Sequence, residues 1–308
     1  MNIRLEQPAD YREVENLTRE AFWNIYKPGC VEHFVLNQYR TNPDFIPELD
    51  FVMEDLSPTL SKGEGDIKPR IIGHVMFSKA KIILDSPLKG ELEGATFGPI
   101  SIHPDYKRKG YGLKLLQYSL EKAREMGIGV ICMEGNIDFY KHAGFQLASS
   151  LKIHNHGQPK EAEVPYFLAQ ELIPGYLNGV EGTYHTPQGY FVAMEKEEEF
   201  EQYEATFPAK EKLFQEGQLP QFCQSCGMPL TKNEDCGKNA DGSTNYEYCQ
   251  YCYKDGHFMQ EMTMEELIEH CSQFVDEVNK LMPEPMTRED YKQMMRGYFP
   301  MMKRWRKK

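Results

Sequence analysis

The stretch Ile-Ser-Ile-His-Pro-Asp-Tyr-Lys-Arg-Lys-Gly-Tyr-Gly-Leu, residues 100–113, decides the fold of this chain. A strand is predicted to end at Pro104, and a helix with regularly spaced apolar residues is predicted from Gly112. Glycines at positions 110 and 112 let the backbone approach a ligand without a Cβ in the way. The first N–H groups of the helix have no intrahelical acceptor, and the cations Lys107–Lys109 lie beside them. The stretch therefore predicts a site for an anion such as a pyrophosphate.

Taken alone, this glycine pattern is also what an ordinary tight turn uses. The spacing is not the dinucleotide fingerprint Gly-x-Gly-x-x-Gly, because Leu115 stands where the third glycine would be. The stretch also lacks the Gly-Lys-Ser/Thr of a nucleotide-binding phosphate loop. The residues by themselves leave a plain turn and an anion site both open.

The residues around the turn predict one mixed domain of strands and helices over residues 1–195. Asp10 followed by Glu13 is a capping-box-like helix start, and Gly127 is a typical residue after a helix end. Strands are predicted at residues 2–7, 51–54, 70–84, 95–103, 130–133, 164–172 and 189–194, and helices at residues 10–23, 32–40 and 112–126.

In this context the turn resembles the signature of the GNAT superfamily of acyl-CoA-dependent N-acyltransferases. That signature is a strand, then Gln/Arg-x-x-Gly-x-Gly/Ala, then a helix, and later Tyr-x-x-x-Gly-Phe. This chain carries Lys107-x-x-Gly110-x-Gly112 and, further on, the segment Tyr140–Phe145. Lys107 replaces the usual Gln or Arg, and Asn136 lies close before Tyr140, which looks like a bacterial subfamily with a shortened final helix. The resemblance implies an α+β fold, with a mixed twisted sheet flanked by helices.

The same resemblance implies a reaction, the transfer of an acetyl group from acetyl-CoA to a primary amine of a small molecule or a peptide. A backbone N–H on the strand before the turn would polarise the thioester carbonyl. Tyr140 would protonate the leaving thiolate as general acid, or would only pack on the pantetheine arm. The coenzyme A contacts that the resemblance implies are Ile100, Ser101, Ile102, Lys107, Arg108, Lys109, Gly110, Tyr111, Gly112, Leu113 and Asn136.

The general base is not identified by a motif. Glu134, at the end of a predicted short strand, is the first candidate, and His74, on the predicted strand 70–84, is the second. Each has a plain alternative, as a surface carboxylate or as a histidine hydrogen-bonded in the core, and a chain of water molecules could also serve. The loops Cys30–Asp50 and Leu56–Pro69 are expected to shape the pocket for the amine.

A second motif lies in the last third of the chain. The four residues Cys223, Cys226, Cys249 and Cys252 form the pattern Cys-x₂-Cys-x₂₂-Cys-x₂-Cys. Two such pairs can place four thiolates around one tetrahedral ion, so the pattern predicts a structural Zn²⁺ site, against a redox dithiol or two disulfides. Cys236, between the pairs, is expected to be a free loop thiol, although it could compete as a ligand, and Cys271 is expected in an apolar core.

Residues 222–308 are predicted to form one module, with residues 196–221 as an acidic linker before it. The module resembles a zinc-ribbon domain of bacterial proteins, some of which also carry a GNAT partner. Thr263 and Glu266 form a capping box that predicts an amphipathic helix reaching Leu281, and residues 287–299 predict another helix.

The composition of the chain restricts the classes of partner that it is expected to bind. The formal net charge of −12 argues against nonspecific binding to nucleic acid. Apart from the cations of the turn, the basic cluster is the tail Lys303–Lys308. The sequence shows no apolar run near the roughly 20 residues of a membrane span, and we expect a cytoplasmic protein. A homodimer and a protein partner for the zinc module stay open. The alternative function is an acyl-CoA-binding regulatory or adaptor protein that recruits its partner through the zinc ribbon.

Overall fold

The computed structural model describes residues 1–56, 69–85, 89–280, 282 and 284–306. These residues form two compact units. Unit 1 comprises Met1–Phe22 and Cys30–Lys210, and unit 2 comprises Trp23–Gly29 and Glu211–Lys308. Among the described residues, no helix is long and apolar enough to cross a membrane.

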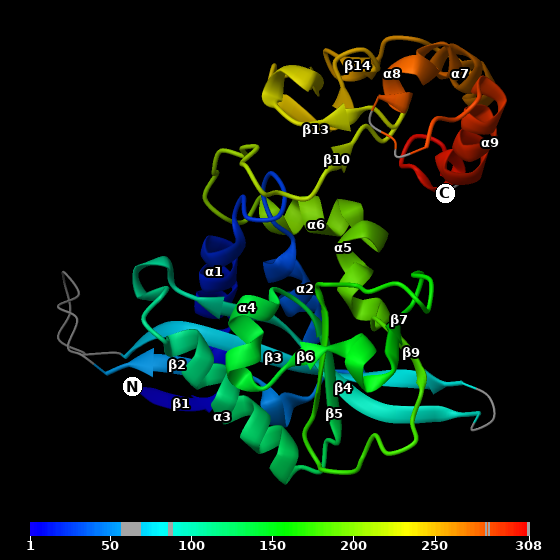
Figure 1. Ribbon diagram of the computed structural model, residues 1–308. Helices are drawn as coiled ribbons and strands as arrows, with labels where there is room; N and C mark the ends of the chain where they lie inside the picture. The colour runs from blue at the N-terminus through cyan, green and yellow to red at the C-terminus, as the bar shows by residue number, and fades with distance from the viewer. Residues whose placement is uncertain (57–68, 86–88, 281, 283, 307–308) are drawn as a thin grey trace, which may run out of the picture. The chain divides into compact units, whose positions relative to one another are not determined.

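Unit 1 is built on one mixed sheet (Figure 1). The strands follow the order β1-β2-β3-β4-β5-β8-β6, and β9 pairs with β3 and with β7. The pairs β4–β5 and β7–β9 are parallel and the other pairs are antiparallel. The strands are β1 Asn2–Leu5, β2 Phe51–Asp55, β3 Arg70–Leu84, β4 Glu91–Ile102, β5 Val130–Glu134, β6 Gln146–Leu147, β7 Ile153–Asn155, β8 Phe167–Glu171 and β9 Gly182–His185.

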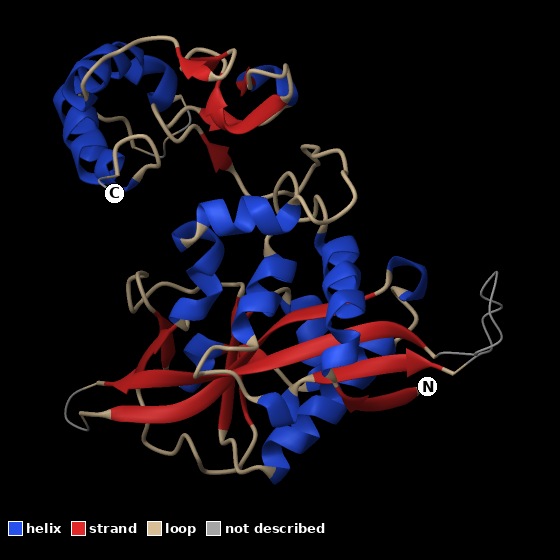
Figure 2. Ribbon diagram, turned by 180° about the vertical axis from the view of Figure 1, so that it is seen from behind, coloured by secondary structure: helices blue, strands red, loops and turns tan. Residues whose placement is uncertain are grey.

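Helices cover both faces of this sheet (Figure 2). On one face, α1 and α2 pack Leu17 and Phe34 against Val52 and Met76. On the other face, α3 packs Leu115 and its neighbours against a second apolar cluster. The helices are α1 Tyr11–Phe22, α2 Glu32–Tyr39, α3 Tyr111–Glu125, α4 Ile137–Tyr140, α5 Val192–Glu195 and α6 Glu197–Glu204. The expected α+β architecture, a mixed sheet flanked by helices, is confirmed.

Within the described residues, strands β4 and β5 are paired only at one end, and they are not paired near the turn. Along these two parallel strands the described backbone pairs only at Ala95 and Ile131. The remainder of β4, from Thr96 to Ile102, is held on its other side by β3, through pairs such as Ser101 with His74. The last residues of β4 therefore run up to the turn without β5 along the described part of that edge.

Residues 189–194, predicted as a strand, are helical instead. They belong to a 3₁₀ turn, Gln188–Phe191, and to α5. Val192 and Ala193 are both buried against the cluster that contains Phe34, and successive buried residues suit a helix better than an alternating strand. The additional strand in this region is β9, whose four residues are too short for a clear periodic signal.

The acidic stretch after α5 also has regular structure. Helix α6 contacts α2, and its Glu204 forms an ion pair with Arg19 at 2.5 Å. The Nε2 atom of His33 lies 2.8 Å from the same carboxylate. Residues 196–210 of the predicted linker belong to unit 1, and residues 211–221 belong to unit 2.

Unit 2 consists of small β-hairpins followed by helices. Its strands are β10 Gln221–Phe222, β11 Pro229–Leu230, β12 Cys236–Lys238, β13 Thr244–Cys249, β14 Tyr253–Lys254 and β15 His257–Phe258, and its helices are α7 Met264–Cys271, α8 Val275–Asn279 and α9 Arg288–Tyr298. Thr263 caps α7 as predicted, with Glu266 completing the capping box. The predicted continuous helix is wrong, however, because a 3₁₀ turn at Ser272–Phe274 interrupts it, and Phe274 is exposed. Leu281 lies outside the described residues.

Candidate functional site

The turn after β4 has the conformation that an anion site needs. A 3₁₀ turn, Pro104–Tyr106, leads into Lys107, and α3 then begins behind Gly110. Gly110 has φ +83°, in the left-handed region that favours glycine. Because this N-cap residue has no side chain to accept from the first N–H groups of α3, those donors point out of the helix and are available to a ligand.

The three cations of the turn have different environments. Lys107 Nζ donates to the backbone carbonyl of Ala21 at 2.9 Å, and desolvation there lowers the pKa of Lys107 below its ordinary value. Lys109 Nζ donates to the carbonyl of Asp105 at 2.7 Å, while Arg108 is exposed at φ +59°. Lys107 thus ties the turn to the last turn of α1, and Arg108 is placed at the open surface of the turn.

The strand residues predicted to polarise the carbonyl lie directly before the turn. Ile100, Ser101 and Ile102 pair with β3 residues. The Ser101 side chain is buried and donates to Thr18 Oγ1 at 3.0 Å. The backbone N–H of His103 donates to the Ile72 carbonyl of β3. Because backbone direction alternates along a strand, the N–H groups of Ile100 and Ile102 face the open edge, and that of Ser101 faces β3.

The segment around Tyr140 packs beside the turn. A Cβ built on Gly112 would lie 3.6 Å from Phe139 Cζ, so α3 begins next to the residue that precedes Tyr140. The Tyr140 ring packs against Phe97, Phe139 and Phe145, with ring centroids 4.9–5.9 Å apart. The fold therefore brings together the two motifs that are about thirty residues apart in the sequence.

Gly135 and Asn136 shape the start of α4. A Cβ on Gly135 would lie only 2.4 Å from Tyr140 Cε2, so glycine is what allows the ring to pack over the chain. The Asn136 side chain accepts from the backbone N–H of Asp138 at 2.8 Å and caps α4. This cap gives Asn136 a structural role beside the predicted coenzyme contact.

The two candidate bases lie in different environments. Glu134 ends β5, is exposed, and accepts from Asn155 Nδ2 at 3.1 Å. His74 is fully buried, with Nε2 2.7 Å from Asp50 Oδ1, and burial lowers the pKa of His74 to about 4. The core hydrogen-bonding interpretation therefore fits His74, and Glu134 is the candidate that solvent reaches.

The acceptor loops are described only in part. The loop Cys30–Asp50 contains α2, whereas residues 57–68 of Leu56–Pro69 lie outside the described residues. A cavity of about 1020 Å³ opens near the first residues of β4 and β5, with Gly94 and Gly129 in its lining. Residues 44–48 of the loop Cys30–Asp50 line this cavity, which lies at the paired end of the two strands. None of the predicted catalytic and coenzyme-contact residues lines it.

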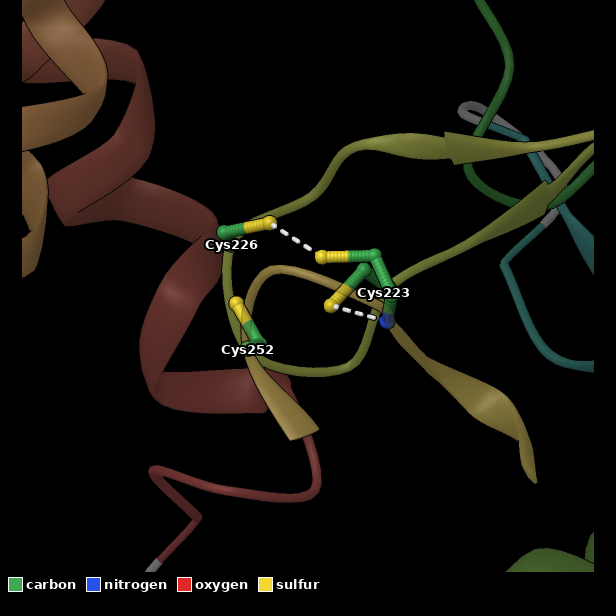
Figure 3. A group of neighbouring side chains, drawn as sticks. Cys223, Cys226 and Cys252 are labelled. Atoms are coloured by element: carbon green, nitrogen blue, oxygen red, sulfur yellow. Dashed lines mark hydrogen bonds between the residues drawn. The ribbon is translucent and has the colours of Figure 1, made fainter. Parts of the chain in front are cut away.

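The four predicted cysteine ligands converge in unit 2. Figure 3 shows the sulfur atoms of Cys223, Cys226 and Cys252 directed toward one another. The four Sγ atoms all lie within 4.8 Å of one another, and Cys226 Sγ is 3.7 Å from Cys249 Sγ. That distance is too long for a disulfide, and it matches the separation of about 3.8 Å between two thiolates on a tetrahedral zinc ion with Zn–S near 2.3 Å. The donor set and its spacing therefore fit a zinc ion.

Local backbone geometry holds these thiols. The N–H of Gly227 donates to the Cys223 carbonyl, and Gly227 has φ +76°, as expected for the tight turn of a knuckle. Cys249 N donates to Cys223 Sγ at 3.2 Å. Cys236 is buried in β12 outside this group, and burial raises the pKa of its thiol to about 11. Cys271 lies in the apolar cluster of α7 and α9, where the sequence predicts it.

Comparison with known proteins finds a family match in each of two regions of the chain. The acetyltransferase (GNAT) family matches residues 20–145, and the family described as "Putative zinc ribbon domain" matches residues 222–306. The N-acetyltransferase YjhQ of Escherichia coli strain K12 is 29% identical over 98 residues, which are 31% of this chain and 49% of YjhQ. The chain thus spans about half the length of that relative. The N-acetyltransferase YhbS of the same strain is 24% identical over 183 residues, 59% of this chain and 93% of YhbS.

Among solved structures, that of E. coli YhbS in complex with CoA is similar to this chain. The aligned region spans 61% of this chain and 91% of the YhbS chain, with 21% sequence identity and a TM-score of 0.48. The zinc ribbon match lies within unit 2, and the GNAT match lies in unit 1 except for residues 23–29. Residues 20–145 therefore match the GNAT acetyltransferase family, and residues 222–306 match a zinc ribbon family.

Proposed function

We propose that unit 1 transfers the acetyl group of acetyl-CoA to a primary amine of a small molecule or a peptide. The observation that carries this proposal is the turn itself, with Gly110 in the left-handed region, the first N–H groups of α3 uncapped by a side chain, and Arg108 exposed beside them. This arrangement suits the pyrophosphate of coenzyme A. The open edge of β4 leads from the turn toward Tyr140 and suits the pantetheine arm.

The proposed reaction assigns one role to each of these groups. The amine nitrogen attacks the thioester carbonyl carbon while a backbone N–H among Ile100–Ile102 stabilises the negative charge on the carbonyl oxygen. The carbon–sulfur bond then breaks, and the thiolate takes a proton from the Tyr140 hydroxyl. Glu134 accepts the proton that the amine loses, directly or through water. Holding both substrates in line supplies much of the rate.

Replacing Tyr140 with phenylalanine is expected to lower kcat by about 100-fold, because the leaving thiolate loses its proton donor. The affinity for acetyl-CoA should change by less than about threefold, since the ring and its packing against Phe97 and Phe145 remain. Tyr118→Phe is the matched control, because that ring packs against Phe51 in the core away from the turn. An unchanged kcat in Tyr140→Phe, measured with a verified amine, would rule out the general-acid role.

The acceptor is identified by measuring thiol release from acetyl-CoA across a panel of small amines and peptide N-termini. Amine-dependent release, with an acetylated product of the matching mass, supports the proposal. Tight acetyl-CoA binding with no release on any amine would instead favour a regulatory acyl-CoA-binding protein.

Unit 2 holds one structural zinc ion through Cys223, Cys226, Cys249 and Cys252. Four thiolates fill a tetrahedral ion, so no coordination position is left for water or substrate. The ion supplies folding energy to a unit made of short hairpin strands and short helices.

A further inference from the structure

Three side chains of types that can ligate a metal ion lie together in unit 1, at the edge of the sheet formed by β3, β9 and β7. Asp85 directly follows β3, His154 is in the middle of β7, and Glu181 directly precedes β9. Backbone pairing fixes all three segments. Asp85 N donates to the Glu181 carbonyl at 2.9 Å, and His154 is paired in register with Thr183 of β9.

The side chains converge from these fixed positions. One ligand atom from each of Asp85, His154 and Glu181 lies within 4.8 Å of the other two, and His154 Nε2 is 3.7 Å from Glu181 Oε1. His154 Nε2 is buried and has no hydrogen-bond partner among the described residues. A buried ring nitrogen without a partner loses its hydration with no compensating bond, which a metal ion would provide. The Glu181 side chain is 53% exposed, so solvent reaches the cluster.

We propose that Asp85, His154 and Glu181 bind a divalent first-row transition-metal ion. An ion about 2.1 Å from each ligand requires ligand atoms roughly 3–4 Å apart, and rotation of the two carboxylates achieves this from the present positions. Two carboxylates and a neutral imidazole balance the charge of a divalent ion. This oxygen and nitrogen donor set is harder than the four thiolates of unit 2, and it suits Mn²⁺ or Zn²⁺. Water completes the coordination on the exposed side, and the bound ion ties β7 to the end of β3.

A neighbouring lysine allows a test in which a substitution should strengthen metal binding. Lys160 Nζ donates to Asp85 Oδ2 at 2.6 Å, so the ammonium group occupies the carboxylate that the metal needs. Metal binding must displace this ion pair. Removing the lysine charge should therefore strengthen metal binding, an effect that misfolding of a variant does not produce.

The same edge offers a matched control histidine. His156 lies two residues beyond His154 and stacks on His185, with the ring centroids 3.9 Å apart. His156→Ala removes an imidazole from the same surface and leaves Asp85, His154 and Glu181 in place.

The experiment is a Mn²⁺ titration of the full-length chain carrying one equivalent of Zn²⁺, which the four thiolates of unit 2 take up first. Binding is measured as the loss of the electron paramagnetic resonance signal of free Mn²⁺. Thiolates favour zinc over manganese, so the unit 2 site does not contribute. We expect one Mn²⁺ per chain, affinity lowered at least about tenfold in His154→Ala and Asp85→Asn, affinity raised about threefold in Lys160→Gln, and no change in His156→Ala.

Three results would overturn the proposal. The first is no saturable binding to the wild-type chain up to about 1 mM Mn²⁺, a concentration at which even weak protein sites fill. The second is equal binding by wild type and His154→Ala. The third is weaker binding in Lys160→Gln. The readout is metal binding alone, so its outcome is independent of the proposed acetyl transfer.

Discussion

Replacing Cys249 with serine is expected to remove zinc from the chain and to unfold unit 2. Cys249 is fully buried, and its sulfur lies 3.7 Å from that of Cys226. Binding of structural zinc to small modules provides about 10–16 kcal/mol of apparent free energy. The largest hydrogen-bonded strand of unit 2, β13, has six residues, so the unit has little other β-structure to compensate for the lost ion. Unit 1 has its own core and should stay folded.

Zinc content after desalting and hydrogen exchange of the two units measure this effect. We expect about one zinc per wild-type chain and less than about a tenth of that in Cys249→Ser, with protection lost only in unit 2. Cys236→Ser is the matched control, because Cys236 is buried in the same unit but lies outside the four-thiol group. Retained zinc in Cys249→Ser, or lost zinc in Cys236→Ser, would contradict the assigned ligand set.

Replacing Arg40 with alanine is expected to destabilise unit 1 by about 3–5 kcal/mol, because two buried carboxylates lose their shared counter-ion. The Arg40 guanidinium, 5% exposed, lies 2.7 Å from Glu6 and 2.5 Å from Glu15, whose side chains are 0% and 6% exposed. It also stacks on the Tyr11 ring at 3.8 Å. Removing one partner of such a group leaves uncompensated charge in the core.

The loss of unfolding free energy in Arg40→Ala should depend on pH. Burial raises the pKa of Glu6 to about 7, although the hydrogen bond from Arg40 opposes this shift. A carboxyl whose pKa is higher in the folded state stabilises the fold fully below pH 4.5, and this contribution is lost as the pH rises through 7. Without Arg40 the pKa of Glu6 rises further. Arg40→Ala should therefore lose more free energy of unfolding at pH 8 than at pH 5.5.

Urea unfolding of the wild type and the variant at these two pH values checks the prediction. Lys81→Ala, which breaks the exposed ion pair with Glu91, should cost less than about 1 kcal/mol at either pH. Adding Glu6→Gln to Arg40→Ala should recover part of the loss at pH 8, because the unpaired charge is removed. A loss equal at both pH values, or no recovery in the double variant, would contradict this account.

Much of the fold could be predicted because its elements carry strong local signals. The long β3 was predicted with its observed bounds, since a fifteen-residue stretch rich in β-branched and apolar residues has no competing interpretation. Helix α9 begins behind the Thr287 cap. The clustering of the four cysteines could be predicted because the spacing Cys-x₂-Cys is typical of zinc knuckles.

The parts that escaped prediction depend on distant residues. Residues 188–195 form short helical segments because Val192 and Ala193 pack against α2, which a run of eight residues does not reveal. The contact between Lys107 and the Ala21 carbonyl depends on where α1 ends in space. Asp85, His154 and Glu181 likewise come together from segments about seventy and about thirty residues apart. The short strands that carry them contain no motif, so the sequence did not predict that they are neighbours.

The most direct test of the central claim is calorimetric binding of acetyl-CoA to the wild-type chain, to Gly110→Val and to Gly112→Ala. At φ +83° a β-branched residue is strained, and relief of that strain turns the first N–H groups of α3 away from the pyrophosphate. A Cβ at Gly112 meets only ordinary contacts, 3.4 Å from Ile102 and 3.6 Å from Phe139. The account predicts one site per wild-type chain, affinity at least about tenfold weaker in Gly110→Val, and a change below about threefold in Gly112→Ala. No binding to the wild type, or equal binding by the wild type and Gly110→Val, would contradict it.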